Sequence, residues 1–157
     1  MINTLERADY AEVKELYINP NVRKYLGGTR QEGSIITMLD EMVHAEEDPF
    51  HWVVREKSTG DFIGVVSLDF HHEGTYHEVS YQLLPNWWGA GYATEAVQAI
   101  IDFALNDLNF SRVIAETQSA NKQSCRLLER LGMEFEKTIS RFGAEQAIYS
   151  INRKTGG

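Results

Sequence analysis

The sequence predicts an α+β fold in which helices pack on a central, mostly antiparallel sheet. Three segments rich in β-branched and aromatic residues follow one another over residues 51–84 with only short turns between them, which is typical of antiparallel strands. Farther along, helical periodicity alternates with short β-rich segments up to residue 152. The chain has 157 residues, a usual length for one domain. We expect residues 1–154 to form this domain and residues 155–157 to be a loose tail.

The first predicted elements are a short strand and a helix. Ile2–Leu5 favours a strand. Asp9 is a residue type that caps helix starts, and apolar residues follow it at helical spacing, which predicts a helix to about Tyr17. We expect Pro20 to stop this helix, because proline lacks the N–H that a helix interior needs.

A second helix is predicted after the Gly27-Gly28 break. Ser34 can cap it, and it should end before Pro49. Its apolar positions, at spacings of three and four, are Ile35, Ile36, Leu39 and Met42. Residues 32–48 hold six Asp or Glu residues and no Lys or Arg. Such a run is usually a solvated helix face, but it can also attract a cationic partner.

The remaining elements alternate in a regular order. Strands are predicted at His51–Glu56, Phe62–Phe70 and Tyr76–Leu84. An apolar stripe from Ala93 to Leu108 then predicts the longest helix. The last predicted elements are a strand, a helix and a hairpin, at Arg112–Thr117, Asn121–Leu131, and Met133–Arg141 with Ala147–Asn152. The predicted order is therefore β-α-α-β-β-β-α-β-α-β-β.

Composition and charge exclude several classes of partner. Hydrophobic residues make up 43% of the chain, yet no apolar run approaches the roughly 18 residues that span a bilayer. The formal net charge of −8 argues against binding nucleic acid and favours a cationic partner. The start lacks an apolar leader, and the single cysteine, Cys125, cannot form an internal disulfide. We therefore expect a cytoplasmic protein without a membrane partner.

The most specific signal is the pair Gly89 and Gly91, one residue apart and just before the longest predicted helix. Glycine allows positive φ and close approach of a ligand, and a helix start attracts phosphate. The pair thus predicts an anion cradle. A dinucleotide-binding domain would use a similar pair, with Glu116 as the ribose-binding acid. However, Thr94 stands where the third glycine should be, and the antiparallel strands argue against that fold.

Three motifs together resemble the GNAT N-acetyltransferases, in particular the branch that includes the ribosomal-protein N-terminal acetyltransferases. They are Leu83-Leu84-Pro85 at a strand end, Trp-Gly-x-Gly-Tyr-Ala-Thr-Glu-Ala over 88–96, and Asn121-x-x-Ser124 followed by Leu131-Gly132-Met133. The resemblance covers nearly the whole chain. Asn86 departs from the family's Gln or Arg at the head of the glycine pattern. This departure is mild, because backbone N–H groups do the binding.

The resemblance implies a three-layer fold with a twisted sheet, in which two neighbouring parallel strands splay apart around acetyl-coenzyme A. Here they would be the strands at 76–84 and 112–117. Backbone groups near Leu83 and Leu84 would pair with the pantetheine arm, and Asn121 would bond the same region, although a helix cap is the alternative for Asn121. The pyrophosphate would be held by the amides of Gly89, Ala90, Gly91, Tyr92, Ala93 and Thr94.

The implied reaction is direct attack of a primary amine on the thioester. Glu78 matches an acidic residue that many members carry and would be the general base, directly or through water; an ordinary polar strand face is the alternative. Where many relatives carry a tyrosine as general acid, this chain has Leu128, which makes Ser124 the candidate. The alternatives for Ser124 are a bond to a backbone carbonyl or a cofactor contact. An acyl-enzyme on Cys125 is rejected, because nothing nearby in the sequence pairs it with a histidine base.

The acceptor is the least determined part of the prediction. Tyr25 and Trp52 are aromatic candidates for lining the acceptor site. A protein or peptide N-terminus is the preferred acceptor, and a polyamine or an aminoglycoside is the alternative. The missing tyrosine also leaves a non-catalytic acyl-CoA sensor as an alternative, and a homodimer is compatible with the family. No metal is expected, because the five histidines lack ligand spacing.

Overall fold

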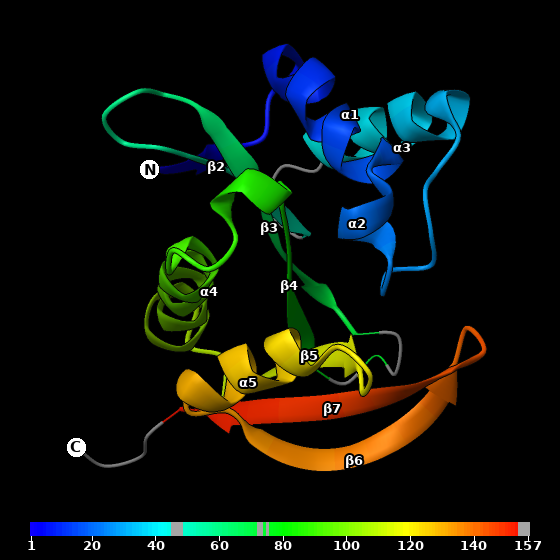
Figure 1. The fold of residues 1–157 in the computed structure, drawn as a ribbon. Coiled ribbons are helices and arrows are strands. Elements are labelled where there is room, and N and C mark those ends of the chain that lie inside the picture. The colour runs from blue at the N-terminus through cyan, green and yellow to red at the C-terminus, as the bar shows by residue number, and fades with distance from the viewer. Residues whose placement is uncertain (45–48, 72–73, 75, 154–157) are drawn as a thin grey trace.

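One mixed sheet joins the two halves of the protein. The computed structural model describes all residues except 45–48, 72–73, 75 and 154–157 (Figure 1). In this described part the sheet has seven strands in the order β1-β2-β3-β4-β5-β7-β6. All neighbouring strands pair antiparallel except β4 and β5, which run parallel. The strands are β1 (Ile2–Thr4), β2 (Phe50–Arg55), β3 (Phe62–Phe70), β4 (His77–Leu83), β5 (Arg112–Gln118), β6 (Glu134–Arg141) and β7 (Ala144–Asn152).

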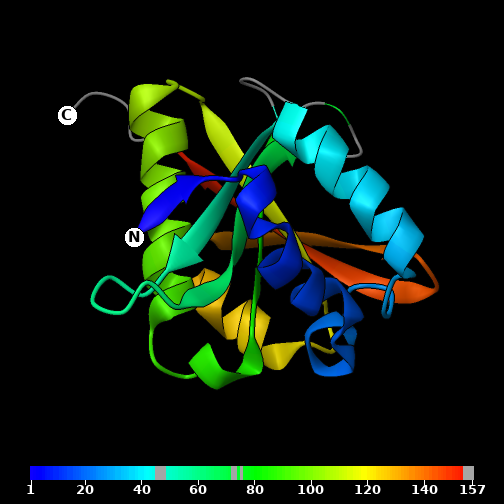
Figure 2. The ribbon, with the colours of Figure 1, turned by 90° about the horizontal axis from the view of Figure 1, so that it is seen from above.

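Helices cover both faces of this sheet (Figures 1 and 2). The helices are α1 (Tyr10–Ile18), α2 (Pro20–Arg23), α3 (Glu32–His44), α4 (Tyr92–Asp102) and α5 (Lys122–Arg130). One buried apolar cluster joins α1, α2 and α3 to Val53 and Val65 of the sheet. The other joins α4 and α5 to Val66 and Val79, which point to the opposite face. The predicted three-layer α+β fold is therefore confirmed.

The chain between α1 and α3 differs from the prediction. Pro20 does not only follow the end of α1: it is the first residue of the short helix α2. The Asn19 side-chain oxygen accepts hydrogen bonds from the N–H groups of Asn21 (2.9 Å) and Val22 (3.2 Å) and so caps this helix. Proline fits the first helical position, where its missing N–H costs nothing and its φ is already helical.

The start of α3 also differs from the prediction. The helix begins at Glu32, two residues before the cap expected at Ser34. The Ile35 N–H already donates to the Gln31 carbonyl at 3.1 Å, and the Glu32 carboxylate pairs with Lys14 of α1. An ion pair to α1, rather than a serine cap, therefore accompanies the first turn. The acidic residues at 46–48 and the tail at 155–157 lie outside the described residues.

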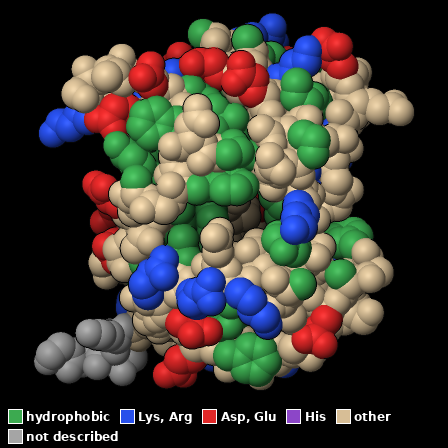
Figure 3. All heavy atoms as spheres, viewed as in Figure 1, with side chains coloured by type: hydrophobic (Ala, Val, Ile, Leu, Met, Phe, Trp, Pro, Cys, Tyr) green, Lys and Arg blue, Asp and Glu red, His purple; other side chains and the backbone are tan. Residues whose placement is uncertain are grey.

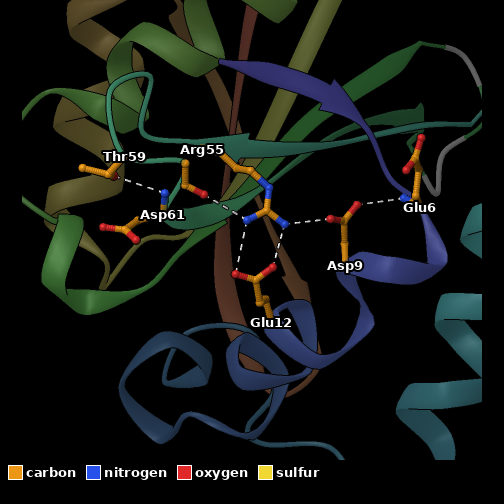
Figure 4. Close-up of polar contacts among 7 residues, drawn as sticks. Glu6, Asp9, Glu12, Arg55, Thr59 and Asp61 are labelled. Atoms are coloured by element: carbon orange, nitrogen blue, oxygen red, sulfur yellow. Dashed lines mark hydrogen bonds and ion pairs between the residues drawn. The ribbon is translucent and has the colours of Figure 1, made fainter.

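Asp9 lies at the N-cap position of α1, as predicted, but its side chain does not cap that helix. It belongs to a charged cluster that holds α1 to the sheet (Figure 4). The Asp9 carboxylate accepts from the Glu6 N–H at 2.9 Å and from the Arg55 guanidinium of β2 at 2.7 Å. Arg55 also contacts Glu12 of α1 at two points, 2.6 and 3.2 Å. These hydrogen bonds raise the pKa of Arg55, so its charge is maintained. Paired charged hydrogen bonds of this kind fix orientation as well as distance.

The C-terminal hairpin is longer than predicted. β7 begins at Ala144, three residues before the predicted start at Ala147. Phe142 and Gly143 form the connecting two-residue turn and have positive φ values of 54° and 72°. Such a turn matches the twist of the flanking strands, so pairing continues up to it. The sequence pattern alone did not locate this turn.

Gly64 of β3 is expected to be intolerant of any side chain. A Cβ at this position would lie 2.1 Å from the Gln82 carbonyl oxygen and 2.8 Å from the Leu83 Cα. Gly64→Ala should therefore force β3 and β4 apart and lower the free energy of unfolding by about 1–3 kcal/mol. Thermal unfolding should show a melting temperature lower by roughly 2–4 °C for each kcal/mol.

Gly33→Ala is the matched control for this substitution. Gly33 lies in α3, and a Cβ there meets nothing within 4 Å. Alanine is the better helix former, so this variant should melt at or above the wild-type temperature. Equal melting temperatures for the two variants would contradict the close approach of β3 and β4.

Candidate active site

The parallel pair β4 and β5 separates almost as soon as it forms. The two strands pair at His77 with Val113 and at Glu78 with Ile114. Beyond these pairs β4 stays on β3 while β5 stays on β7, so residues 79–83 have no partner on β5 in the described structure. A gap therefore opens in the sheet on the C-terminal side of Glu78. The resemblance described above implied that these two strands would splay apart.

The surface is hollowed at this gap. Figure 3, viewed from the same side as Figure 1, shows hydrophobic side chains around a hollow at the centre of the molecule, with a row of Lys and Arg side chains below it over α5. Lys122, Arg126 and Arg130 are exposed on α5 and, being four residues apart, share one side of the helix. An apolar hollow beside a row of cations suits a ligand that carries both an apolar arm and phosphates.

The glycine segment forms an open turn at the start of α4. Gly89 and Gly91 both have positive φ, 76° and 85°, and a Cβ on either would meet nothing within 4 Å. Gly91 occupies the N-cap position of α4, where no side chain caps the helix. The first N–H groups of a helix have no partner within it, so those of Tyr92, Ala93 and Thr94 can point at a ligand. The Tyr92 hydroxyl bonds Glu56 and anchors this turn to the end of β2.

The backbone at Leu83 and Leu84 is less free than predicted. The Leu83 carbonyl accepts from the Trp88 indole N–H at 2.9 Å, and the Leu84 N–H donates to the Ile63 carbonyl at 2.9 Å. The Leu84 carbonyl accepts from the Trp87 N–H at 3.0 Å. Three of the four polar backbone groups of these two residues therefore already have partners. A ligand that pairs like an added strand would find its open edge over residues 79–83.

Glu78 lies where the two strands part. Its side chain is half-buried and, by strand alternation, points to the face opposite α4 and α5. Burial and the negative charge of Glu116 raise the pKa of Glu78 to about 7, against the lowering effects of Arg141 and of the Glu116 backbone N–H. A carboxylate with this pKa can accept a proton near neutral pH and release it again.

Glu116 of β5 forms a buried polar group beside Glu78. Its carboxylate bonds His71 at 2.7 Å, and it accepts from Arg141 at 3.1 and 3.3 Å. The His71 side chain is 0% exposed and that of Glu116 is 7% exposed. Sequence reasoning considered Glu116 only as a ribose-binding acid and missed this group, because its partners come from separate segments. The sequence carries no local signal for such a contact.

Ser124 lies on the other face of the gap. It is buried, and its hydroxyl lies 2.8 Å from the Tyr81 hydroxyl of β4. The Asn121 side-chain oxygen accepts from the Ser124 N–H at 3.2 Å, so Asn121 caps α5. Leu128, at the position of the missing tyrosine, is packed in the core. Tyr81 is a residue that sequence reasoning missed, although strand alternation already placed it on the face opposite Glu78.

The two aromatic candidates for the acceptor site lie in different places. Tyr25 is half-buried in the turn after α2, where Lys24 lies over its ring. Trp52 instead stacks on Phe50 and meets the edge of Phe103, within the cluster that packs on α4. Trp52 therefore faces away from Glu78, because β2 directs alternate side chains to opposite faces. Only Tyr25 is on the same side of the sheet as Glu78.

The described residues include neither a metal-binding cluster nor a membrane-spanning helix. Among them, no group of three or more His, Cys, Asp or Glu side chains is arranged to hold a metal ion. Cys125 is buried, and its sulfur is a free thiol. In the same part of the chain, no helix is both long and apolar enough to cross a membrane.

Comparison with known proteins agrees with this geometry. Residues 1–134 match the family model described as "Acetyltransferase (GNAT) domain". The chain is 34% identical over 154 residues to the uncharacterized protein YkkB of Bacillus subtilis (strain 168), covering 94% of this chain and 89% of that protein. It is 29% identical over 101 residues to the [ribosomal protein uS5]-alanine N-acetyltransferase of Escherichia coli (strain K12), covering 63% and 52% of the two chains.

A solved structure shows the same fold. The spermidine N-acetyltransferase from Vibrio cholerae, in complex with CoA and spermine, superposes with a TM-score of 0.84 at 18% identity, over 98% of this chain and 95% of that one. The family match spans most of the sequence, and the gap, the glycine turn and the raised pKa of Glu78 agree with it. The chain therefore belongs to the GNAT acetyltransferase family and is an acetyl-CoA-dependent N-acetyltransferase.

Proposed function

We propose that this protein acetylates the free amine of a protein or peptide N-terminus, by direct attack of the amine on the thioester of acetyl-CoA. The observation that carries the proposal is Glu78, a half-buried carboxylate with a pKa of about 7 where β4 and β5 part. An amine must lose a proton to become an amide, and Glu78 can take this proton, directly or through a water molecule. A protein nucleophile is not required.

The cofactor contacts follow from the shape of the gap. The open edge of β4 up to Leu83 and Leu84 would pair with the pantetheine arm, and Asn121 would lie along it at the start of α5. The amides from Gly89 to Thr94 would hold the pyrophosphate, since the helix start has no side-chain cap. The cofactor supplies the activated acetyl group when bound. Glu78 on one face of the sheet would then accept the proton of the amine, and Ser124 on the other face would donate a proton to the sulfur.

Ser124 is proposed as the group that protonates the departing sulfur. Its hydroxyl belongs to the face of the sheet opposite Glu78, so acid and base flank the gap from two sides. A proton delivered from one side and removed from the other keeps the two groups from neutralising each other.

Two arginines favour an acceptor with a single amine. The Arg23 guanidinium of α2 donates to the Gln82 side chain at 3.0 Å, and Arg141 bonds Glu116. Gln82 shares the strand face of Glu78, so both guanidinium groups border the acceptor side. A polyamine would bring several positive charges near these two guanidinium groups, whereas a peptide N-terminus brings one. Tyr25, two residues from Arg23, would line the same entrance.

A polyamine is the second candidate, favoured by the net charge of −8. Two of the acidic residues of α3 are already engaged, however. Glu32 pairs with Lys14, and Asp40 accepts from the Tyr10 hydroxyl at 2.8 Å. The Lys14 ammonium offsets the charge of Glu32, and the Tyr10 hydroxyl occupies one oxygen of Asp40, so α3 offers a cation less than its sequence indicates.

A panel of acceptors tests the proposed substrate. Thiol release from acetyl-CoA would be measured with short peptides that have free N-termini, with their N-acetylated forms, with spermidine and spermine, and with an aminoglycoside. We expect the highest kcat/KM for a free peptide N-terminus and no turnover of the blocked peptide. A higher kcat/KM for a polyamine would contradict the assignment. If none of the amines causes thiol release, the result would favour a non-catalytic sensor.

Glu78→Gln tests the base. This variant keeps the shape of the side chain but cannot accept a proton, so kcat should fall by about 10²–10⁴-fold. In the wild type, kcat should fall as the pH drops below about 7, because only the ionised form of Glu78 is a base and its pKa is about 7. With saturating acceptor, this acidic limb should be absent in Glu78→Gln.

Glu136→Gln provides the control for a changed carboxylate. Glu136 lies on β6, where it pairs with Arg112 and bonds Ser150 away from the gap. This variant should keep the wild-type pH profile. Retention of both the rate and the acidic limb in Glu78→Gln would exclude Glu78 as the base.

A further inference from the structure

The hydroxyl groups of Tyr81 and Ser124 form a hydrogen-bonded pair at the gap. Tyr81 comes from the part of β4 that has no β5 partner, and Ser124 from the first turn of α5. Their oxygen atoms are 2.8 Å apart, a normal distance for an O–H···O hydrogen bond. Ser124 is 8% exposed, and Tyr81 packs at the edge of the core cluster under α4 and α5. The pair thus reaches the gap from the face opposite Glu78.

We propose that Tyr81 supplies, through the Ser124 hydroxyl, the proton that the departing CoA sulfur takes up. This inference rests on the proposed transfer reaction and adds to it the source of the proton. Tyr81 is a positioning residue, because it acts through Ser124 and does not itself touch the sulfur.

The direction of the hydrogen bond decides what Ser124 can do. A hydroxyl has a single proton to donate. When the Tyr81 hydroxyl donates to Ser124, the serine proton stays free to point into the gap. The Asn121 side chain does not compete for it, because it accepts from the Ser124 backbone N–H. An isolated serine would be left negatively charged after donating, whereas here the adjacent phenol replaces the lost proton.

The proton transfers balance as follows. As the C–S bond breaks, its electron pair goes to sulfur, and sulfur takes the proton of the Ser124 hydroxyl. Ser124 takes the phenol proton of Tyr81 in the same step. The resulting phenolate recovers a proton from solvent after the thiol has left, while the proton that Glu78 took from the amine returns to solvent. Tyr81, Ser124 and Glu78 therefore end each catalytic cycle in the protonation states in which they began.

The surroundings of Tyr81 fit this role. Burial and the nearby Cys125 thiol raise the pKa of Tyr81, while the hydrogen bond with Ser124 and the charge of Arg130 lower it. Tyr81 therefore holds its proton at neutral pH. The positive charge of Arg130 at the end of α5 favours the phenolate when it forms.

The test compares Tyr81→Phe, Ser124→Ala and the double variant in the acetyl-CoA assay with the best acceptor of the panel. Each single variant should lower kcat by about 100-fold. The double variant should be no worse than the more affected single variant, because residues that act as one unit are not additive. The wild-type kcat should also fall at high pH as Tyr81 loses its proton, and this basic limb should be missing in Tyr81→Phe.

Tyr149→Phe is the matched control. Tyr149 is a buried tyrosine on the same face, and its hydroxyl donates to Glu129 at 3.1 Å. Its loss should leave kcat and the basic limb unchanged. Thermal unfolding with and without CoA would check that each variant folds and binds the cofactor. Loss of the basic limb shows that a titrating proton has been removed. A packing defect would lower kcat without changing its dependence on pH.

The outcomes separate this inference from the proposed function. Wild-type turnover together with an unchanged kcat and basic limb in Tyr81→Phe would overturn the role of Tyr81 and leave the transferase reaction intact. Effects of the two single variants that multiply in the double variant would also overturn it, because the hydroxyls would then act separately. Absence of wild-type turnover with every amine would instead count against the proposed function.

Discussion

The early separation of β4 and β5 is the constraint on which the site depends. Two residue pairs join the strands, and each strand then continues on its other neighbour, β3 or β7. Backbone N–H and C=O groups away from water need partners, so a gap inside a sheet is stable only where solvent or a ligand can supply them. The extensive antiparallel pairing on both sides keeps the two halves in place without closing the gap.

The same separation leaves proton-transferring side chains on both faces of the sheet next to the gap. Strand alternation directs Glu78 to the side of α1–α3 and Tyr81, three residues later, to the side of α5. A thioester held between the strands would therefore meet a proton acceptor on one side and a hydroxyl pair on the other. The charged groups around Glu78 are Asp69 of β3, Glu116 of β5 and Arg141 at the end of β6, so the C-terminal hairpin also influences the pKa of Glu78.

Local patterns in the sequence predicted most of the fold, and contacts between distant segments were not predictable. The hydrophobic periods located the strands and the long helices, and Gly89 and Gly91 located the start of α4. The predicted longest helix is shorter than expected, because α4 ends at Asp102 and a π-helix continues over Phe103–Asp107. Asp9 does lie at the N-cap position of α1, but its carboxylate bonds the Glu6 N–H and Arg55 and does not cap the helix. The Ser34 cap was wrong because α3 already begins at Glu32. Trp52 has no local feature that distinguishes core packing from a lining role. The links from Tyr81 to Ser124 and from Glu116 to His71 and Arg141 join residues 25 to 45 positions apart, beyond the reach of any local pattern.

Hydrogen–deuterium exchange of the wild-type protein, with and without saturating CoA, tests the central claim most directly. The account predicts that CoA slows exchange in two segments, the open edge of β4 at residues 79–84 and the glycine turn with the first residues of α4 at 89–94. Strands β1 and β2 should exchange at the same rate in both samples. Unchanged exchange in the two segments, with slowing confined to another part of the chain, would contradict the placement of the cofactor between β4 and β5.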